Sequence, residues 1–453
     1  MSSKRTSKLQ PYSGYFLRDV PDSDPELTRT GPGTPMGEFM RRFWQPVCLS
    51  SELTDLPLAI RILGEDLVAF RDKSRRIGIL ARHCSHRGTS LEYGIVSERG
   101  IRCCYHGWLY DVDGTVLETP GEPRNSPRKN TVMHGAYPAL EYKGLVFAYM
   151  GIPDQKPPFP ILDTYDTPDN NMVAYSVWYP CNWLQVKENF VDPAHAYFLH
   201  SNVTTVQFSA AWAEMPTYDW AETPDGQGMY YITVRRTEDR VWVRSNHIWL
   251  PNVGQVAGLL EKAENEKFFH RVSITRWTVP IDDTHAWIMG WRHFNDVVDP
   301  FHEGKPEECG RDSVDFYGQT GNRTYEQKQR IPGDWDAQTS QRPIAVHALE
   351  HLATTDIGVA MWRRLLHKAI RGEMHVASQS PRDDGDAIHT YTHDTVLRVP
   401  SLPGPDERAT LKQIGRDVLT AILSGDRFTG SEREAEIKKN LEAVKQRYAV
   451  ALV

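Results

Sequence analysis

The chain lacks the features that mark several classes of protein. Its 453 residues contain no run of about 18 or more apolar residues, so no membrane-spanning helix is expected. The N-terminal segment MSSKRTSKLQPYSG is polar and has no apolar core of a secretory signal. Six cysteines are too few for a disulfide scaffold, which indicates a reducing compartment. A formal net charge of −7 offers no basic surface for nucleic acid or anionic lipid. The sequence predicts a soluble, cytoplasmic protein with neither a membrane nor a nucleic-acid partner.

Turn signals and prolines divide the chain into three parts. Residues 1–42 are rich in Pro, Gly, Ser and Asp and are expected to form an irregular arm with one short helix over 37–43. Over 43–152, short alternating apolar runs are separated by turn dipeptides, which predicts a small all-β domain. A proline-rich stretch opens the remainder, 153–453, which mixes helix-like and strand-like segments. Within it, the polar and weakly periodic stretch 299–342 is expected to form loops.

Two short motifs in the all-β part each pair one cysteine with one histidine. They are Cys84-x-His86 and Cys103-x-x-His106, separated by sixteen residues. Three interpretations are open: unrelated thiols and imidazoles in a β domain, a structural zinc site, or a [2Fe–2S] cluster with two Cys on one iron and two His on the other. The cysteine precedes the histidine in both motifs. Two facing loops could therefore present both thiolates to one iron and both imidazoles to the other, which favours the cluster.

The segments RHCSHRGTSLEYG and CCYHGWLYDVDGTVLETPGEP resemble the cluster loops of the Rieske non-haem iron oxygenases, specifically the α-subunits related to phthalate dioxygenase. The resemblance spans residues 35–400. It implies an α+β fold with a small all-β Rieske [2Fe–2S] domain over 43–152. A larger helix-grip-like catalytic domain, with an antiparallel sheet and flanking helices, would occupy 153–453. The cysteines outside the motif are expected to be structural thiols: Cys48, Cys104, Cys181 and Cys309.

The segment NWLQVKENFVDPAHAYFLH predicts a second metal site. His195 and His200 are five residues apart, about 140° on an ideal helix, so a straight helix would not converge them on one ion. Pro193 is expected to break the helix, with Asp192 capping the second piece, so that both imidazoles turn toward one metal. Two His and one carboxylate leave three positions open, as Fe(II)/O₂ chemistry requires. The alternative is a pair of core histidines, but an electron-delivering cluster needs a destination.

The resemblance implies roles for these residues. His195 and His200 would bind a mononuclear iron, and Asp192 would be the bridging aspartate, hydrogen-bonded to a ligand histidine and to a cluster histidine of the adjacent subunit. The third ligand would be Asp356 in LEHLATTDIGVAMWRRLL, although an N-cap is an alternative role for it. Other candidates for the third ligand are Asp334, Asp336 and Glu350.

The resemblance also implies a reaction. The chain would be the terminal oxygenase of a multicomponent system, activating O₂ at Fe(II) to hydroxylate or O-demethylate a small aromatic substrate. Electrons would come from a separate NAD(P)H-dependent flavin/iron–sulfur reductase or a ferredoxin, since the chain has no Gly-rich dinucleotide fingerprint. A head-to-tail homotrimer, alone or stacked as a hexamer, would bring each cluster to a neighbour's iron. Two alternatives remain open: a Rieske electron-transfer or sensor protein without oxygenase activity, and an N-demethylase acting on a non-aromatic substrate.

A carboxylated substrate would need a fixed cation. Arg244, on the strand-like RVWVRSNHIWLP, and Arg342, in the segment before the predicted third ligand, are the candidates, with Arg235 or Arg236 beside them. Surface charge on an exposed strand is the alternative reading of these arginines. Three tryptophans are candidates either for an apolar cavity or for the core: Trp212, Trp249 and Trp291.

Overall fold

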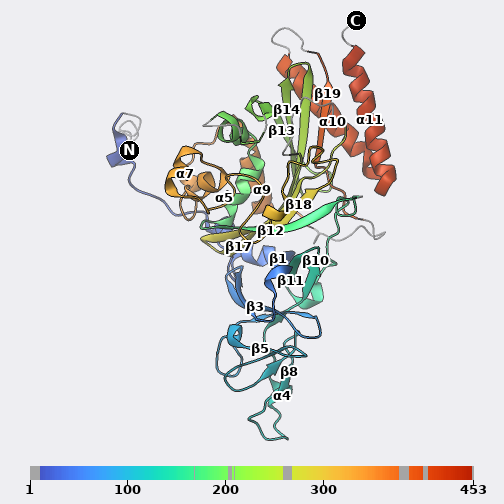
Figure 1. Ribbon diagram of the computed structural model, residues 1–453. Coiled ribbons are helices and arrows are strands. Elements are labelled where there is room, and N and C mark those ends of the chain that lie inside the picture. Colours follow the sequence, from blue (N-terminus) through green and yellow to red (C-terminus); the bar gives the residue numbers. More distant parts are fainter. Residues whose placement is uncertain are drawn as a thin grey trace.

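The computed structural model describes residues 11–167, 169–202, 207–208, 210–258, 268–376, 387–400 and 407–450. Figure 1 shows a small β region at one end of the molecule and a larger region in which helices flank a long antiparallel sheet. This arrangement confirms the predicted α+β fold. Within the described residues, no helix is both long enough and apolar enough to cross a bilayer.

The N-terminal arm carries short helices, and the one that was predicted is present. The helices are η2 (Ser13–Phe16), α2 (Pro25–Thr28) and α3 (Pro35–Arg41). Helix α3 starts two residues earlier than predicted because Thr34 caps it, its side chain accepting the Gly37 N–H at 3.2 Å, and because Pro35 occupies the first turn.

The small β region consists of three antiparallel sheets. The first contains β1 (Trp44–Leu49), β11 (Leu145–Tyr149) and β10 (Ala139–Tyr142). The second contains β2 (Leu58–Ile62), β3 (Glu65–Arg71), β4 (Ile77–Ala81) and β9 (Ala136–Tyr137). The third contains β5 (Ile95–Val96), β6 (Ile101–Arg102), β7 (Leu109–Tyr110) and β8 (Val116–Glu118). Short helical turns connect them: η3 (Ser50–Glu52), η4 (Leu91–Tyr93), α4 (Arg128–Thr131) and, after β11, η5 (Pro153–Gln155). All eleven strands lie within 43–152, but the boundaries at 42 and 152 stay predictions.

The larger region is built on one antiparallel sheet of eight strands, in the order β12-β18-β17-β16-β15-β14-β13, with β19 paired to β15. The strands are β12 (Asn171–Tyr179), β13 (Thr217–Glu222), β14 (Gly228–Thr237), β15 (Arg240–Trp249), β16 (Val253–Val256), β17 (Ile274–Asp282), β18 (His285–Phe294) and β19 (His393–Arg398). The main hydrophobic core joins this sheet to the small β region. At the junction the ring of Phe147 lies 5.4 Å from Trp277 and 5.9 Å from Trp291. Trp291 is therefore a core residue.

Helices flank both faces of this sheet (Figure 1). The segments that lead to the site are α5 (Trp183–Glu188), η6 (Asn189–Val191), α6 (Ala194–Tyr197), η7 (Phe198–Asn202, a π-turn) and η8 (Ala210–Ala213). They are followed by η9 (Pro306–Glu308), α7 (Tyr325–Arg330), α8 (Asp334–Thr339), η10 (His347–Leu349), η11 (Thr354–Asp356) and α9 (Ile357–Ile370). Helices α7 and α8 lie in the stretch that was expected to form loops, so that expectation is wrong in part.

A C-terminal hairpin completes the fold. It consists of α10 (Glu407–Leu423), η12 (Ser424–Arg427) and α11 (Gly430–Val450). Helix α10 covers β13 to β15. The predicted apolar stripe of α11 packs against α10, with Ile437, Leu441 and Val444 buried. Arg433 of α11 is 2% exposed and binds Asp163 at 2.7 Å, which ties the hairpin to the segment after the small β region.

Candidate metal centres and substrate cavity

The two Cys/His loops of the small β region have the same backbone structure. The Cys84 N–H donates to the Thr89 carbonyl (2.9 Å), and the Gly88 N–H donates back to the Cys84 carbonyl (2.7 Å). In the second loop the Cys103 N–H donates to the carbonyl five residues later (2.8 Å), and the amide four residues later donates back (3.1 Å). The residue that donates back is a glycine with φ near 75° in both loops, as this turn requires. The loops therefore form a matched pair.

The cysteines of these loops are buried, and the two histidines lie beside each other. The thiols of Cys84 and Cys103 are each 3% exposed, and burial raises the pKa of the Cys103 thiol. The imidazoles of His86 and His106 lie 4.5 Å apart, and Trp108 stacks on His86 at 4.8 Å. The Nδ1 atom of His86 is buried without a hydrogen-bond partner. A buried nitrogen left in this way, in a matched pair of loops that each offer one thiol and one imidazole, fits a [2Fe–2S] cluster held by two Cys and two His.

The second predicted site lies where the helix breaks at Pro193, as expected from the sequence. Segment η6 ends at Val191, and the Asp192 carboxylate accepts the Ala194 N–H at 2.9 Å. The chain then passes into the π-turn that contains His200. This change of helix type brings the rings of His195 and His200 to 5.3 Å.

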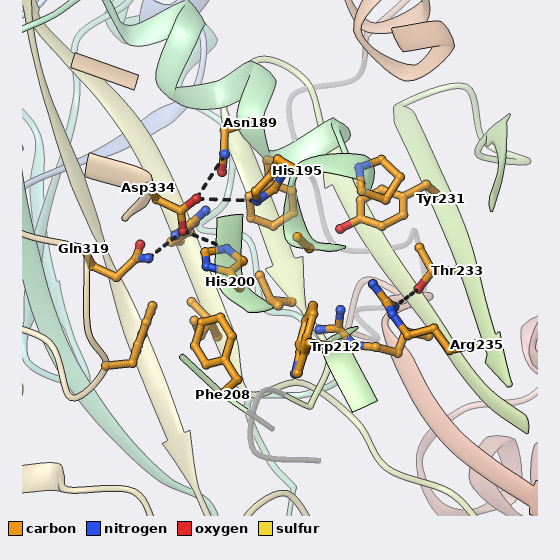
Figure 2. Close-up of a pocket in the computed structure, with 18 residues that line it drawn as sticks. Asn189, His195, His200, Phe208, Trp212, Tyr231, Thr233, Arg235, Gln319 and Asp334 are labelled. Atoms are coloured by element: carbon orange, nitrogen blue, oxygen red, sulfur yellow. Dashed lines mark hydrogen bonds and ion pairs between the residues drawn. The ribbon is translucent and has the colours of Figure 1, made fainter. Parts of the chain in front are cut away.

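Asp334, at the start of α8, completes a group of three with these histidines (Figure 2). Its carboxylate oxygens lie 3.4 Å from His195 Nε2 and 3.5 Å from His200 Nε2. One ligand atom from each of the three residues lies within 4.8 Å of the other two. Burial raises the pKa of the Asp334 carboxyl, but the neighbouring His200 and His195 outweigh it and hold that pKa well below its usual range. The geometry suits a mononuclear metal with open positions.

The structure corrects the predicted third ligand. Asp356 does not join the two histidines, and its carboxylate instead accepts the Ala353 N–H at 2.6 Å where the chain enters α9. That bond closes the short turn η11 ahead of α9. Asp356 stands at the N-cap position of α9, as its alternative reading placed it, but its side chain makes no capping hydrogen bond to that helix. Of the other two candidates, Asp336 pairs with Arg323 at 2.6 Å and Glu350 pairs with Arg363 at 2.6 Å.

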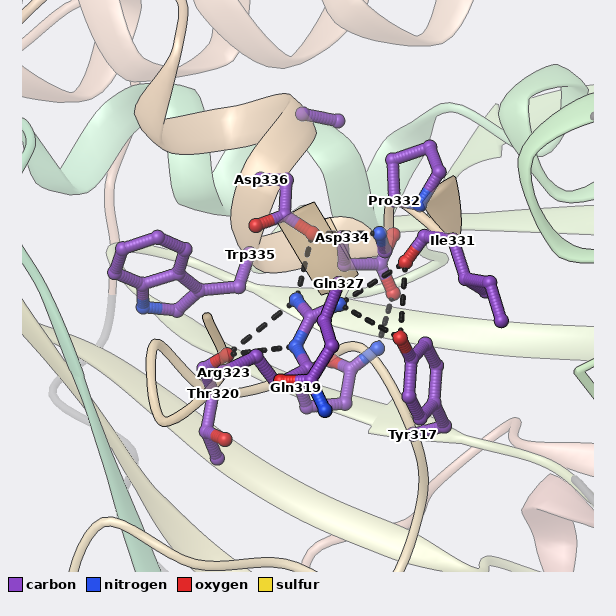
Figure 3. A network of polar contacts seen from close by, with 12 residues as sticks. Tyr317, Gln319, Thr320, Arg323, Gln327, Ile331, Pro332, Asp334, Trp335 and Asp336 are labelled. Atoms are coloured by element: carbon purple, nitrogen blue, oxygen red, sulfur yellow. Dashed lines mark hydrogen bonds and ion pairs between the residues drawn. The ribbon is translucent and has the colours of Figure 1, made fainter. Parts of the chain in front are cut away.

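Asp334 is held in place from two sides. The amides of Asn189 and Gln319 donate to its two oxygens at 3.2 Å and 2.5 Å. The loop that carries Gln319 is closed by Arg323, which donates to the Ile331 carbonyl at 3.0 Å as well as to the Asp336 carboxylate (Figure 3). The sequence signal that could have identified Asp334 is the acidic pair in Gly-Asp-Trp-Asp, which begins a short helix.

A cavity opens beside this group of three. Arg235 and Arg244 line it, and both guanidinium groups stack on the ring of Trp212, at 5.0 Å and 4.4 Å. Arg342 is exposed and is not part of the lining, so its predicted contact with substrate is not supported. Arg236 instead forms an ion pair with Glu407, at the start of α10, at 2.9 Å. Trp249, like Trp291, is a core residue.

Comparison with known proteins decides the family. Residues 43–137 match the Rieske [2Fe-2S] domain. The chain is 46% identical to the tert-butanol monooxygenase / tert-amyl alcohol desaturase oxygenase subunit of Aquincola tertiaricarbonis, over 96% of both chains. It is 36% identical to the phenoxybenzoate dioxygenase subunit alpha of Ectopseudomonas oleovorans, over 86% of this chain and 94% of that one. The chain is a Rieske oxygenase.

The resemblance to phthalate dioxygenase is also confirmed. This Rieske oxygenase is 31% identical to the phthalate 4,5-dioxygenase oxygenase subunit of Pseudomonas putida, over 78% of this chain and 86% of that one. Dicamba monooxygenase bound to dicamba superposes with a TM-score of 0.55 over 74% of this chain and 98% of that one, at 17% identity, and so shows the shared fold.

Membership of the Rieske oxygenases makes the chain an oxidoreductase of the non-haem iron type, and its relatives are named as monooxygenases and dioxygenases. The oxygenase relatives imply a mononuclear iron in addition to the Rieske cluster. Oxygenase subunits of this kind work with a separate electron-transfer component. Among solved structures that superpose on this chain is a carbazole-bound oxygenase in complex with its ferredoxin.

Proposed function

We propose that the chain is the terminal oxygenase that hydroxylates or O-demethylates a small aromatic carboxylate with electrons from a separate NAD(P)H-dependent reductase. The observation that carries this proposal is the composition of the cavity. It has the group of His195, His200 and Asp334 on one side and the buried Arg235 on the other, with Trp212 between them (Figure 2).

The residues that would hold the metals follow from the donor sets. Cys84 and Cys103 would bind one iron of the cluster, and His86 and His106 the other. The mononuclear iron would be bound by the group of three described above, and when bound it supplies the activation of O₂.

Hydrogen bonds within the chain orient the imidazoles of the mononuclear site. His200 Nδ1 is 2.9 Å from the side-chain oxygen of Gln207, to which it donates, and His195 Nδ1 donates to the Asp192 carbonyl. Both Nε2 atoms are thereby directed at Asp334. Partners of this kind fix the tautomer and the ring orientation of a ligand histidine.

Arg235 supports a carboxylated substrate. Its side chain is 1% exposed and donates to the Glu214 carbonyl (3.2 Å) and the Thr233 hydroxyl (3.3 Å). Within the part of the chain that the structure describes, no carboxylate forms an ion pair with Arg235. Burial and the nearby Arg244 lower the pKa of Arg235 to about 9. A substrate carboxylate would supply the missing counter-charge, and Phe208 and Trp212 would contact its ring.

The proposal includes a head-to-tail homotrimer in which Asp192 bridges the cluster of one subunit and the iron of the next. Apolar side chains are exposed next to both centres: Tyr105 beside the cluster histidines is 59% exposed, and Phe198 and Ile357 near Asp192 are 59% and 52% exposed. Exposed apolar surface of this kind is typical of an interface. Contact between these two surfaces would bring the cluster of one subunit near the iron of the next, and three such contacts would close a ring of subunits.

The test compares substrates that differ only in charge. 4-Methoxybenzoate and its methyl ester would be supplied to the reconstituted enzyme with a surrogate reductase. If the enzyme demethylates, the acid should yield formaldehyde; if it hydroxylates, the acid should yield a hydroxylated acid. We expect the kcat/KM for the ester to be at least tenfold lower than that for the acid. Arg235→Met should remove that preference, because the cation is lost. Equal turnover of acid and ester by the wild-type enzyme would contradict the carboxylate.

A second candidate substrate is a small tertiary alcohol. It is favoured by the 46% identity to the tert-butanol monooxygenase / tert-amyl alcohol desaturase oxygenase subunit, which exceeds the identity to the named aromatic-acid dioxygenases. Including tert-butanol in the same panel separates the candidates. An iron content near two rather than three per chain, with no product from any substrate, would instead indicate an electron-transfer protein.

A further inference from the structure

The indole of Trp220, on β13, contacts the chain at the point where it enters the mononuclear site. Its Nε1–H donates to the Val191 carbonyl at 3.1 Å. That carbonyl and the Asp192 N–H belong to one peptide group, and the N–H donates to the Asn189 carbonyl at 3.3 Å. The peptide that carries Asp192 is therefore held at both its polar atoms, once by its own turn and once by a side chain from the sheet.

The start of helix α9 packs tightly against this contact. A Cβ atom at Gly358 would lie 2.2 Å from Nε1 of Trp220 and 2.4 Å from the Val191 carbonyl oxygen. No larger residue fits there unless one of these groups moves. Helix α9 is fixed to α5 by Arg363, which donates to both carboxylate oxygens of Glu188 at 2.5 Å and 2.7 Å. Trp220 therefore packs between the start of α9 and the end of η6, which follows α5 in the chain.

The bonds around Asp192 leave its peptide little freedom. Its carbonyl accepts from His195 Nδ1, and its carboxylate accepts the Ala194 N–H at 2.9 Å. The bond from Trp220 is the contact by which the sheet, rather than the local turn, sets the orientation of this peptide. A change of tilt here would move the Asp192 carboxylate relative to a docked cluster without removing a metal ligand.

We infer that Trp220 is a positioning residue for electron transfer between the two metal centres, acting through the Val191–Asp192 peptide. This inference rests on the bridging role proposed for Asp192. In the step concerned, one electron leaves the reduced cluster of one subunit and enters the mononuclear site of the next, so the first is oxidised and the second reduced by one electron. Trp220 itself exchanges no proton and forms no bond to the reactants.

The test uses Trp220→Phe in the full-length holoenzyme, which keeps a ring but removes the N–H donor. The prereduced protein is mixed with O₂ and 4-methoxybenzoate, or tert-butanol if that is the substrate, and the cluster's absorbance is followed through one turnover. We expect cluster reoxidation to slow about tenfold, because small displacements in a reacting assembly have large effects on rate. Iron content, cluster midpoint potential and subunit assembly should be unchanged.

Two companion variants sharpen the result. Gly358→Ala should slow reoxidation in the same way, since its new methyl group displaces the indole or the carbonyl. Tyr218→Phe removes a hydroxyl from a ring on the same face of β13, 5.0 Å from the Trp220 ring, and should have no effect. Hydrogen peroxide supplies both oxygen and electrons, as in ArOCH₃ + H₂O₂ → ArOH + CH₂O + H₂O. Turnover driven by peroxide should therefore be preserved in Trp220→Phe.

Each result bears on the inference. An unchanged reoxidation rate in both Trp220→Phe and Gly358→Ala overturns it, and so does loss of iron or of peroxide-driven turnover, which would make Trp220 a structural part of the iron site. Asp192→Asn serves as the reference. If it slows reoxidation and the Trp220 variant does not, the positioning role fails while the proposed function stands. If Asp192→Asn has no effect either, the bridge itself is refuted.

Discussion

Replacing Asp334 by alanine, in parallel with Asp356→Ala, tests the ligand set of the mononuclear site. The two aspartates have the same chemistry but different surroundings. Asp334 is 8% exposed and faces two imidazoles at 3.4 Å and 3.5 Å, whereas Asp356 accepts a backbone N–H where the chain enters α9. The first change removes a proposed iron ligand and the second removes one hydrogen bond at the start of η11.

The two changes should lower different quantities, iron affinity in the first and the free energy of unfolding in the second. Losing a residue that only orients a metal ligand costs about 10- to 100-fold in affinity, so losing the ligand itself should cost at least about 100-fold, or about 2.7 kcal/mol of binding free energy. Asp356→Ala should leave iron binding unchanged and lower the free energy of unfolding by about 1 kcal/mol, the usual net cost of one lost hydrogen bond. Asn189 and Gln319 would lose their acceptor in Asp334→Ala.

The assay is iron per chain, measured with the visible spectrum of the cluster. We expect about two irons for Asp334→Ala and about three for Asp356→Ala, with the same cluster spectrum in both, because a cluster contributes two irons and the mononuclear site one. The opposite pattern, with iron kept in Asp334→Ala and lost in Asp356→Ala, would refute the assignment. Loss of both centres in Asp334→Ala would indicate that the residue maintains the fold.

Three further predictions concern the cluster, the hairpin and the subunit contact. His106→Cys should keep an iron–sulfur centre and lower its midpoint potential by on the order of 100–300 mV in a redox titration, since a thiolate adds negative charge; an unchanged midpoint would exclude His106 as a ligand. Arg433→Met should lower the free energy of unfolding by about 2–3 kcal/mol in denaturant titrations near pH 7, since Arg271 still pairs with Asp163 at 3.0 Å. Burial raises the pKa of the Asp163 carboxyl, but the two arginines outweigh burial and lower that pKa. The ion pairs therefore stabilise the fold above about pH 4, and the destabilisation caused by Arg433→Met should shrink as the pH falls through the lowered pKa. Asp192→Asn should preserve metal content and assembly in light scattering while coupled turnover nearly disappears, and an active monomer would contradict the bridge.

The sequence predicted the cluster region well because its signals are local. Cys84 and His86, like Cys103 and His106, are separated by one or two residues within a single turn, so the spacing alone specifies which side chains can face one another. The break at Pro193 is equally local, since it follows from the missing N–H of one residue. The resemblance to a known family rested on the same short segments.

The third acidic residue was mispredicted because its position depends on the path of the chain. Asp334 begins α8, a helix of only six residues in a polar stretch, too short to show an apolar periodicity. It reaches the histidines because α8 packs on α5, where the Gln185 amide donates to the Gln338 carbonyl at 2.8 Å. Asp356 carries the stronger local signal, an acidic residue before an apolar helix, and it does stand at the N-cap position of α9, although without a side-chain bond to that helix.

The matched hydrogen bonds of the two Cys/His loops bear on the energy needed to rearrange the site when its charge changes. Each loop is closed across five residues by its own main chain, so the positions of Cys84 and Cys103 are set by backbone bonds rather than by a metal. Groups that are held in advance need little rearrangement at the moment of reaction. A cluster held between two such loops would change charge by one electron with a small reorganisation energy, which favours rapid and repeated transfer of single electrons.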